Sequence, residues 1–272
     1  MTDATSYPSV DGLVVALDSG VLHVTLDRPD KRNAINDEMI VALVDVLTVA
    51  AIDDQLRVIL IEGAGDHFCG GADIVARNRD RDTRPRTGSI QRRLPTQAHR
   101  LVPLLLEVQV PVVCKVRGWA AGIGFSLALA ADFTIAAYDA RFWAPFAERG
   151  FTPDSGMTWL LPRRVGEVRA RELLLLGRKL SGTDAAEWGA IHAAFSTTQL
   201  DAAVDQLVTQ LATGPTVALG LAKKLLHAGR GVSLEQHLPN EAFALELSSR
   251  TDDFREGMTA FRERRAPNFE GH

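Results

Sequence analysis

The chain has 272 residues, of which 46% are hydrophobic and 24% charged, a composition that excludes intrinsic disorder as its main description. Thirty Lys and Arg residues against 34 Asp and Glu give a formal net charge of −4, so we expect no nucleic-acid partner and no anionic membrane surface as partner. Only two cysteines, Cys69 and Cys114, are present, which argues against a disulfide framework or a cysteine-rich zinc site, and no histidine has a second ligand at metal spacing, so we expect no metal. Met1–Gly12 lacks the features of a signal peptide, and we expect a cytoplasmic protein.

Short β-rich runs alternate with helical patterns over the first two-thirds of the chain. Such alternation predicts an α/β fold with parallel strand pairing. In chain order, the predicted elements are a hairpin over Leu13–Leu26, a helix over about Asp37–Ile52, a strand over Val58–Ile61, a strand over Val112–Val116, a helix over about Gly122–Ala131 and a strand over Phe133–Ala137.

The last third, from about Gly166, has the pattern of helices alone, punctuated by glycines. The predicted helices are about Val168–Leu176, Asp201–Ala212, Pro215–Ala228, Leu234–Ser248 and Phe254–Glu263. We therefore divide the chain into a core, 1–200, and a C-terminal helical oligomerisation region, 201–272.

Eight arginines lie between Arg77 and Arg100. The favoured interpretation is a solvated loop followed by a helix that begins near Ile90. A functional alternative is a loop that grips phosphates or acidic groups. An RNA-binding patch is a third interpretation, but no aromatic residue interleaves the arginines to stack on bases.

Two glycine-rich turns, Phe68–Ile74 and Gly118–Gly124, each follow a predicted buried strand and precede a predicted helix. If both turns faced one cleft, two free backbone N–H groups could stabilise an oxyanion on a thioester carbonyl. The alternative for each turn is tight packing. The glycine spacing in the second turn is not that of a dinucleotide-binding fingerprint.

A third turn, Phe151–Gly156, contains Pro-Asp-Ser-Gly. Asp154 in this turn could cap the following helix, or it could be a catalytic base, and the residues alone favour neither. Aromatic side chains around the turn would desolvate a carboxylate and strengthen it as a proton acceptor. They are Phe142, Trp143, Phe146, Phe151 and Trp159.

Six ordered segments resemble the crotonase superfamily, also called the enoyl-CoA hydratase/isomerase family. They are Val24–Asn36 (VTLDRPDKRNAIN), Val58–Ile74 (VILIEGAGDHFCGGADI), Val110–Ala136, Pro153–Gly166, Leu173–Gly189 and Asp252–Phe269. The resemblance covers the chain from about Leu13 to the C-terminus.

This resemblance implies a spiral of ββα units with C-terminal helices that join subunits into trimers or dimers of trimers. It implies an acyl-CoA substrate and no metal or redox cofactor, coenzyme A being part of the substrate. It places the oxyanion-binding N–H groups on Ala72 and Ile123. Further substrate contacts that it suggests are Arg28, Lys31, Asp73, Ile74 and a neighbouring subunit's copy of Arg264 for coenzyme A, with Gly71, Gly122, Ser126, Trp143 and Phe146 around the acyl thioester.

The chain departs from the hydratases of the family at two positions. Hydratases carry two glutamates that activate water, and this chain has Ser126 and Phe146 there. Neither side chain can transfer a proton to or from water. Asp154, in contrast, falls where isomerases of the phenylacetyl-CoA-pathway branch carry an aspartate. The resemblance therefore implies that Asp154 shifts a double bond in an unsaturated acyl-CoA by proton transfer.

Three alternatives stay open at this point. Glu148 could replace the missing glutamates in a non-standard hydratase. Asp154 could be a nucleophile with His99, as in the 4-chlorobenzoyl-CoA dehalogenase branch. The chain could also bind CoA esters or RNA without turnover.

Overall fold

The structure is a computed structural model that describes residues 6–73 and 86–272. Six strands form the main sheet in the order β1-β2-β3-β4-β6-β9, with β1 and β2 antiparallel and the other neighbours parallel. Their bounds are β1 Leu13–Asp18, β2 Val21–Leu26, β3 Val58–Gly63, β4 Val112–Val116, β6 Phe133–Ala137 and β9 Ala193–Phe195. A smaller sheet has the order β5-β7-β8, from Trp119–Ala121, Arg141–Trp143 and Leu180–Ser181.

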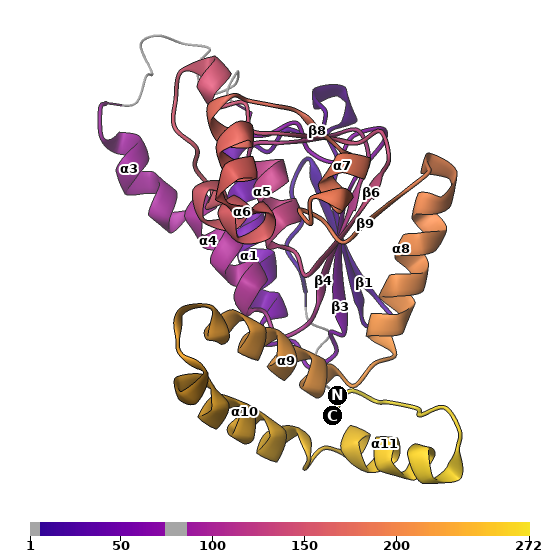
Figure 1. Ribbon diagram of the computed structural model, residues 1–272. Coiled ribbons are helices and arrows are strands. Elements are labelled where there is room, and N and C mark those ends of the chain that lie inside the picture. Colours follow the sequence, from indigo (N-terminus) through magenta and orange to yellow (C-terminus); the bar gives the residue numbers. More distant parts are fainter. Residues whose placement is uncertain (1–5, 74–85) are drawn as a thin grey trace.

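Helices cover both faces of the main sheet. Figure 1 shows α8 along one face and α1, α4 and α5 on the other side. The helices are α1 Asp37–Ala50, α3 Ser89–Arg93, α4 Ala98–Glu107, α5 Ile123–Ala130, α6 Met157–Leu175, α7 Gly182–Glu187, α8 Thr197–Ala212, α9 Thr216–Ala228, α10 Leu234–Ser248 and α11 Asp252–Glu263. This α/β architecture confirms the predicted fold class.

Local sequence explains the elements that position the site. The first four residues of β3 are all buried, as expected for a parallel strand covered on both faces. Helix α1 begins where the Asn36 side chain accepts a hydrogen bond from the Met39 N–H at 2.8 Å, a cap that contributes about 1 kcal/mol. The helix buries Met39, Leu43 and Leu47 on one face, as its apolar spacing predicts.

The prediction of helices alone after Gly166 was wrong. Strands β8 and β9 lie in this part, and β9 pairs with β6 at the edge of the main sheet. Both strands are too short to show a period-2 pattern, so they form only because neighbouring strands supply their hydrogen bonds. Helix α6 consists of two parts that join at Gly166, where φ is 77°; the second part agrees with the helix predicted over about Val168–Leu176, and the first is the helix expected after Asp154. The helix expected after the first glycine turn falls outside the described residues.

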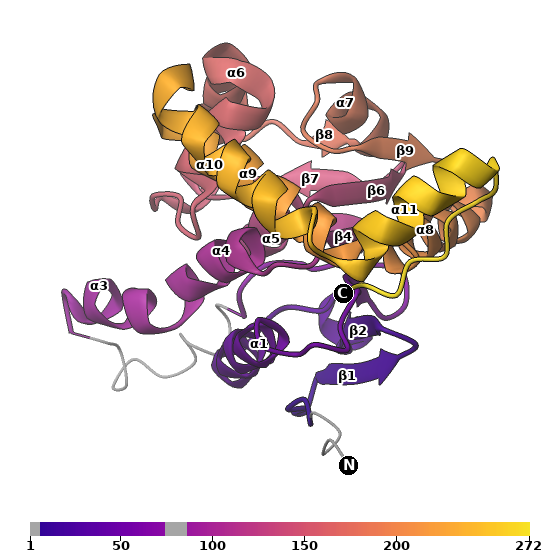
Figure 2. The same ribbon diagram turned by 90° about the horizontal axis from the view of Figure 1, so that it is seen from below.

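The expected division at residue 200 falls inside α8. This helix buries Leu200 and Val204 against the sheet, and its Asp201 carboxylate lies 3.2 Å from the Lys115 ammonium of β4. Helices α9, α10 and α11 instead lie across the underside of the α/β layers (Figure 2). Among the helices that the structure describes, none has the length and apolar character needed to cross a membrane.

Candidate functional site

Backbone pairing holds the two glycine-rich turns against each other. The Cys69 N–H donates to the Trp119 carbonyl at 2.8 Å, and the Ala121 N–H donates to the Cys69 carbonyl at 2.9 Å. A Cβ added at Gly71 would lie 3.3 Å from the Ala121 carbonyl oxygen, and φ at Gly71 is +109°, a value that disfavours other residues. The first turn therefore lies so close to the second that a side chain at Gly71 would make a tight contact with the Ala121 carbonyl, in a backbone conformation that favours glycine.

The N–H group of Ala72 points away from Ile35, the residue to which both neighbours of Ala72 are hydrogen-bonded. The Ile35 N–H donates to the Gly71 carbonyl, and the Asp73 N–H donates to the Ile35 carbonyl, both at 2.9 Å. Extended backbone presents alternate residues to opposite sides, so the N–H of Ala72 faces away from Ile35. No backbone acceptor for this N–H is found among the described residues.

The Ile123 amide is at the N-terminus of α5. The first backbone hydrogen bond of the helix runs from the Ser126 N–H to the Gly122 carbonyl, at 3.1 Å. The Ile123 N–H therefore has no partner within the helix, and it lies at the positive end of the helix dipole. Gly122, with φ +52° and ψ −120°, makes the sharp turn into the helix.

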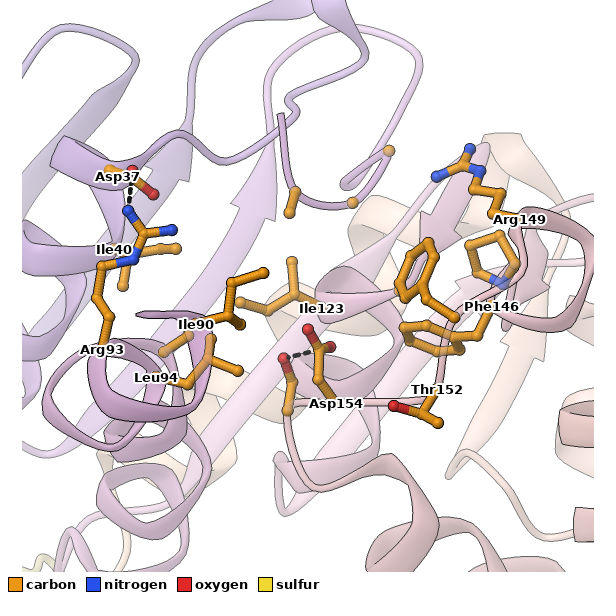
Figure 3. Close-up of a pocket in the computed structure, with 18 residues that line it drawn as sticks. Asp37, Ile40, Ile90, Arg93, Leu94, Ile123, Phe146, Arg149, Thr152 and Asp154 are labelled. Atoms are coloured by element: carbon orange, nitrogen blue, oxygen red, sulfur yellow. Dashed lines mark hydrogen bonds and ion pairs between the residues drawn. The ribbon is translucent and has the colours of Figure 1, made fainter. Parts of the chain in front are cut away.

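Ala72 and Ile123 line one cavity together with Asp154. The cavity has a volume of about 560 Å³ and is also lined by Gly71, Gly122 and Phe146. In Figure 3, the Asp154 carboxylate lies beside the Ile123 side chain, between an apolar group that includes Ile90 and Leu94 and the aromatic ring of Phe146. Two residues whose backbone N–H groups have no backbone acceptor in their own segment, Ala72 and Ile123, thus line the same cavity as the carboxylate residue Asp154.

Asp154 does not cap the helix that follows it. Gly156 is the N-cap of α6, and no side chain accepts a hydrogen bond there. The Asp154 carboxylate instead accepts a hydrogen bond from the Ser155 hydroxyl at 3.0 Å. Of the two interpretations of Asp154 that the sequence left open, capping is excluded.

Charged residues that the sequence analysis did not single out also line the cavity. Asp37 of α1 forms an ion pair with Arg93 of α3 at 3.3 Å, and Arg149 lies beyond Phe146 (Figure 3). Arg93 belongs to the arginine-rich segment, of which residues 77–85 fall outside the described part of the chain. Asp37 and Arg93 are 56 positions apart, and no local pattern connects them.

Several predicted contacts do not line this cavity. Ser126 is fully buried within α5, and Trp143 donates a hydrogen bond to the Gly177 carbonyl at 3.2 Å. Arg28 forms an ion pair with Asp73 at 3.0 Å, next to Ala72. Lys31 and Arg264 are exposed, and Arg264 ends α11; Ile74 is outside the described residues.

Glu148 and His99, which the hydratase and dehalogenase alternatives would use, also do not line the cavity that contains Asp154. Glu148 is exposed, and its carboxyl group lies against Gly177. His99 lines a different cavity, together with Val102 and Leu106 of α4. Cys69 is next to the first turn, but burial raises the pKa of its thiol to about 12, so a nucleophilic thiolate is disfavoured.

A sequence model of the enoyl-CoA hydratase/isomerase family matches residues 16–272. The chain therefore belongs to this family, which confirms the resemblance found in the sequence. It is 40% identical over 256 residues to the 1,2-epoxyphenylacetyl-CoA isomerase of Escherichia coli K12, covering 94% of this chain and 97% of that protein.

Relatives with other activities are similar over the same length. The 2,3-dehydroadipyl-CoA hydratase of E. coli K12 is 33% identical, covering 95% of this chain and 98% of that protein. The crystal structure of an enoyl-CoA hydratase from Polaromonas sp. JS666 superimposes with a TM-score of 0.87 at 28% identity, covering 95% of this chain and 99% of that one. Family membership alone does not choose between isomerase and hydratase.

Proposed function

We propose that this protein is an isomerase that shifts a double bond in an unsaturated acyl-CoA. The thioester carbonyl oxygen accepts hydrogen bonds from the N–H groups of Ala72 and Ile123. These donors stabilise the negative charge that develops on the oxygen when a proton leaves the α carbon.

Asp154 transfers the proton in this proposal. Its carboxylate takes the α proton of a 3-enoyl-CoA, and the resulting dienolate is held by the two amides. Asp154 then returns the proton to the γ carbon, which gives the conjugated 2-enoyl-CoA. A single carboxylate suffices because the proton moves along one face of the substrate.

One observation supports this mechanism above the others: Asp154 lines the same cavity as Ala72 and Ile123. The family resemblance adds that Ser126 and Phe146 occupy the positions where hydratases carry glutamates. The second carboxylate of the lining, Asp37, is paired with Arg93. Glu148 faces Gly177, which speaks against a hydratase that uses this residue. His99 lines another cavity, which speaks against a dehalogenase-like mechanism.

A ring-derived substrate is a second candidate, favoured by the 40% identity to an isomerase of 1,2-epoxyphenylacetyl-CoA. The same amides and the same carboxylate would serve an aromatic-derived acyl group. Apolar side chains, including Ile40, Ile90 and Leu94, leave room for either a ring or a short chain.

The test is mass spectrometry of CoA esters incubated with the enzyme in D2O. We expect 3-enoyl-CoA to yield the 2-enoyl ester with deuterium exchange and no added water, and Asp154→Asn to abolish this conversion. Glu148→Gln is the matched control and is expected to retain it. Parallel reactions with 1,2-epoxyphenylacetyl-CoA distinguish the two substrate classes. Addition of water to 2-enoyl-CoA by the wild type, lost in Glu148→Gln, would instead show a hydratase.

We further propose that coenzyme A runs past Arg28 and Lys31, and that copies of the chain associate through α9–α11. Large apolar side chains on these helices are exposed, including Phe243 (72%) and Phe261 (80%), which is unusual for a monomer. A trimer or a dimer of trimers would cover them and bring Arg264 to a neighbouring subunit. Sedimentation equilibrium tests this, and a monomer at micromolar concentration would contradict it.

A further inference from the structure

Ser155, the residue after Asp154, has an uncommon backbone conformation. Its φ is +53°, in the left-handed region that disfavours residues other than glycine. Gly156, which follows, has φ +76°, so glycine already serves the next position of the same turn. Non-glycine residues held in such conformations concentrate at functional sites. A serine at a position that glycine would fill without strain therefore points to a role of its side chain.

The Ser155 side chain holds one oxygen of the Asp154 carboxylate. Ser155 is 4% exposed and lines the cavity that contains Asp154. Its hydroxyl donates a hydrogen bond to Oδ1 of Asp154 at 3.0 Å, drawn as a dashed line in Figure 3. Within residues 6–73 and 86–272, no other side chain donates a hydrogen bond to this carboxylate and no cation forms an ion pair with it. The bond therefore engages Oδ1 and leaves Oδ2 for the substrate.

A second Asp-Ser pair shows the same geometry outside a cavity. Ser19, in the hairpin of β1 and β2, has φ +50°, and its hydroxyl donates to Oδ1 of Asp18, also at 3.0 Å. Both residues are exposed, and they line neither of the two cavities. Water competes for an exposed carboxylate, so the hydroxyl of Ser19 constrains it little. The bond from Ser155 differs because its donor is buried, where a hydrogen bond is electrostatically stronger.

We propose that Ser155 is a positioning residue that assigns the proton transfer to one oxygen of Asp154. The proposal rests on the proposed function, in which Asp154 takes the α proton and returns it to the γ carbon. A C–H bond breaks at the α carbon as an O–H bond forms at Oδ2, and the same O–H bond then breaks as a C–H bond forms at the γ carbon. A carboxylate without the hydrogen bond to Oδ1 would turn more freely, and it would more often return a proton to the α carbon.

Ser155→Ala and Ser155→Gly separate this role from a purely structural one. Both remove the hydroxyl, but only glycine relieves the left-handed backbone, so Ser155→Gly should unfold at a higher urea concentration than Ser155→Ala. With 3-enoyl-CoA, we expect kcat to fall about tenfold in both variants, the loss of one hydrogen bond to a charged group, and KM to change less than about twofold. In D2O, both variants should return more 3-enoyl-CoA with deuterium at the α carbon for each 2-enoyl-CoA formed.

The matched control is Ser19→Ala, which removes the same hydrogen bond from the same backbone conformation outside the cavity. It should keep the kcat and the deuterium ratio of the wild type. A wild-type kcat in Ser155→Gly would overturn the proposal, because the serine would then be only a turn residue. A lower kcat with an unchanged deuterium ratio would overturn it as well. Either result beside an inactive Asp154→Asn leaves the proposed function standing, whereas an active Asp154→Asn would contradict the proposed function itself.

Discussion

Lys223 of α9 connects the C-terminal helices to the α/β core through a buried ammonium group. It donates hydrogen bonds to the carbonyls of Leu105 at 2.8 Å and Val110 at 3.1 Å, and it lies 2.7 Å from the Asp132 carboxylate. Burial lowers its pKa, and the charge of Asp132 opposes this effect. Replacing Lys223 by Met keeps most of the volume and removes all three interactions.

The expected cost of Lys223→Met follows from the groups left behind. Removing one partner of a buried ion pair typically costs about 3–5 kcal/mol. The Asp132 side chain is 24% exposed and still accepts a hydrogen bond from the Val112 N–H at 2.8 Å, so water and backbone compensate in part. We therefore expect the lower end of the range, about 3 kcal/mol less free energy of unfolding.

Urea unfolding followed by circular dichroism at pH 7.5 measures this loss. Lys224→Met is the matched control, because the neighbouring lysine is exposed and such substitutions usually change stability by no more than about 0.5 kcal/mol. The double variant with Asp132→Asn should lose less than the sum of the single losses, since the two residues interact directly. A loss under about 1 kcal/mol for Lys223→Met, or strict additivity with Asp132→Asn, would refute the reasoning.

Three further predictions concern Gly71, the two buried cysteines and His227. Gly71→Ala should lower kcat about a hundredfold with a smaller change in KM, because the new Cβ would press on the Ala121 carbonyl 3.3 Å away and displace the adjacent amide; an unchanged kcat would count against an oxyanion role for that amide. Burial raises the pKa of Cys69 to about 12 and also raises that of Cys114, so a thiol reagent at pH 8 should label neither residue until urea is added, and prompt labelling of the folded protein would contradict this. The pKa of His227 is lowered on folding, so the unfolded chain binds the proton more readily, and stability should fall as pH drops through about 6.5; His227→Gln should lose less stability than the wild type between pH 7.5 and 5.5, and equal losses would contradict the assignment.

The elements with strong local signals could be predicted from the sequence. The hairpin of β1 and β2, helix α1 and the buried strands β3 and β4 all have apolar periods or turn residues that a few neighbouring positions determine. The short strands β5, β8 and β9 could not be predicted in this way. Each has two or three residues, and the strand beside it supplies its hydrogen bonds.

The candidate site, too, could be predicted from the sequence only in part. The two glycine turns and Asp154 are recognisable in the sequence because only particular residues make those turns. The resemblance of these segments to a family also implies that Ala72, Ile123 and Asp154 lie together. That Asp154 does not cap α6 could not be read from the sequence, because both roles use the same residue at the same position.

By itself, the sequence determined the family and the α/β class, since these depend on residue identity and order. The tertiary structure decided which side chains share a cavity. It paired Asp37 with Arg93, directed Glu148 toward Gly177, and put His99 and His227 in the lining of a second cavity. Such contacts join residues far apart in the chain, and the packing of whole helices and strands sets their distances, which no local pattern records.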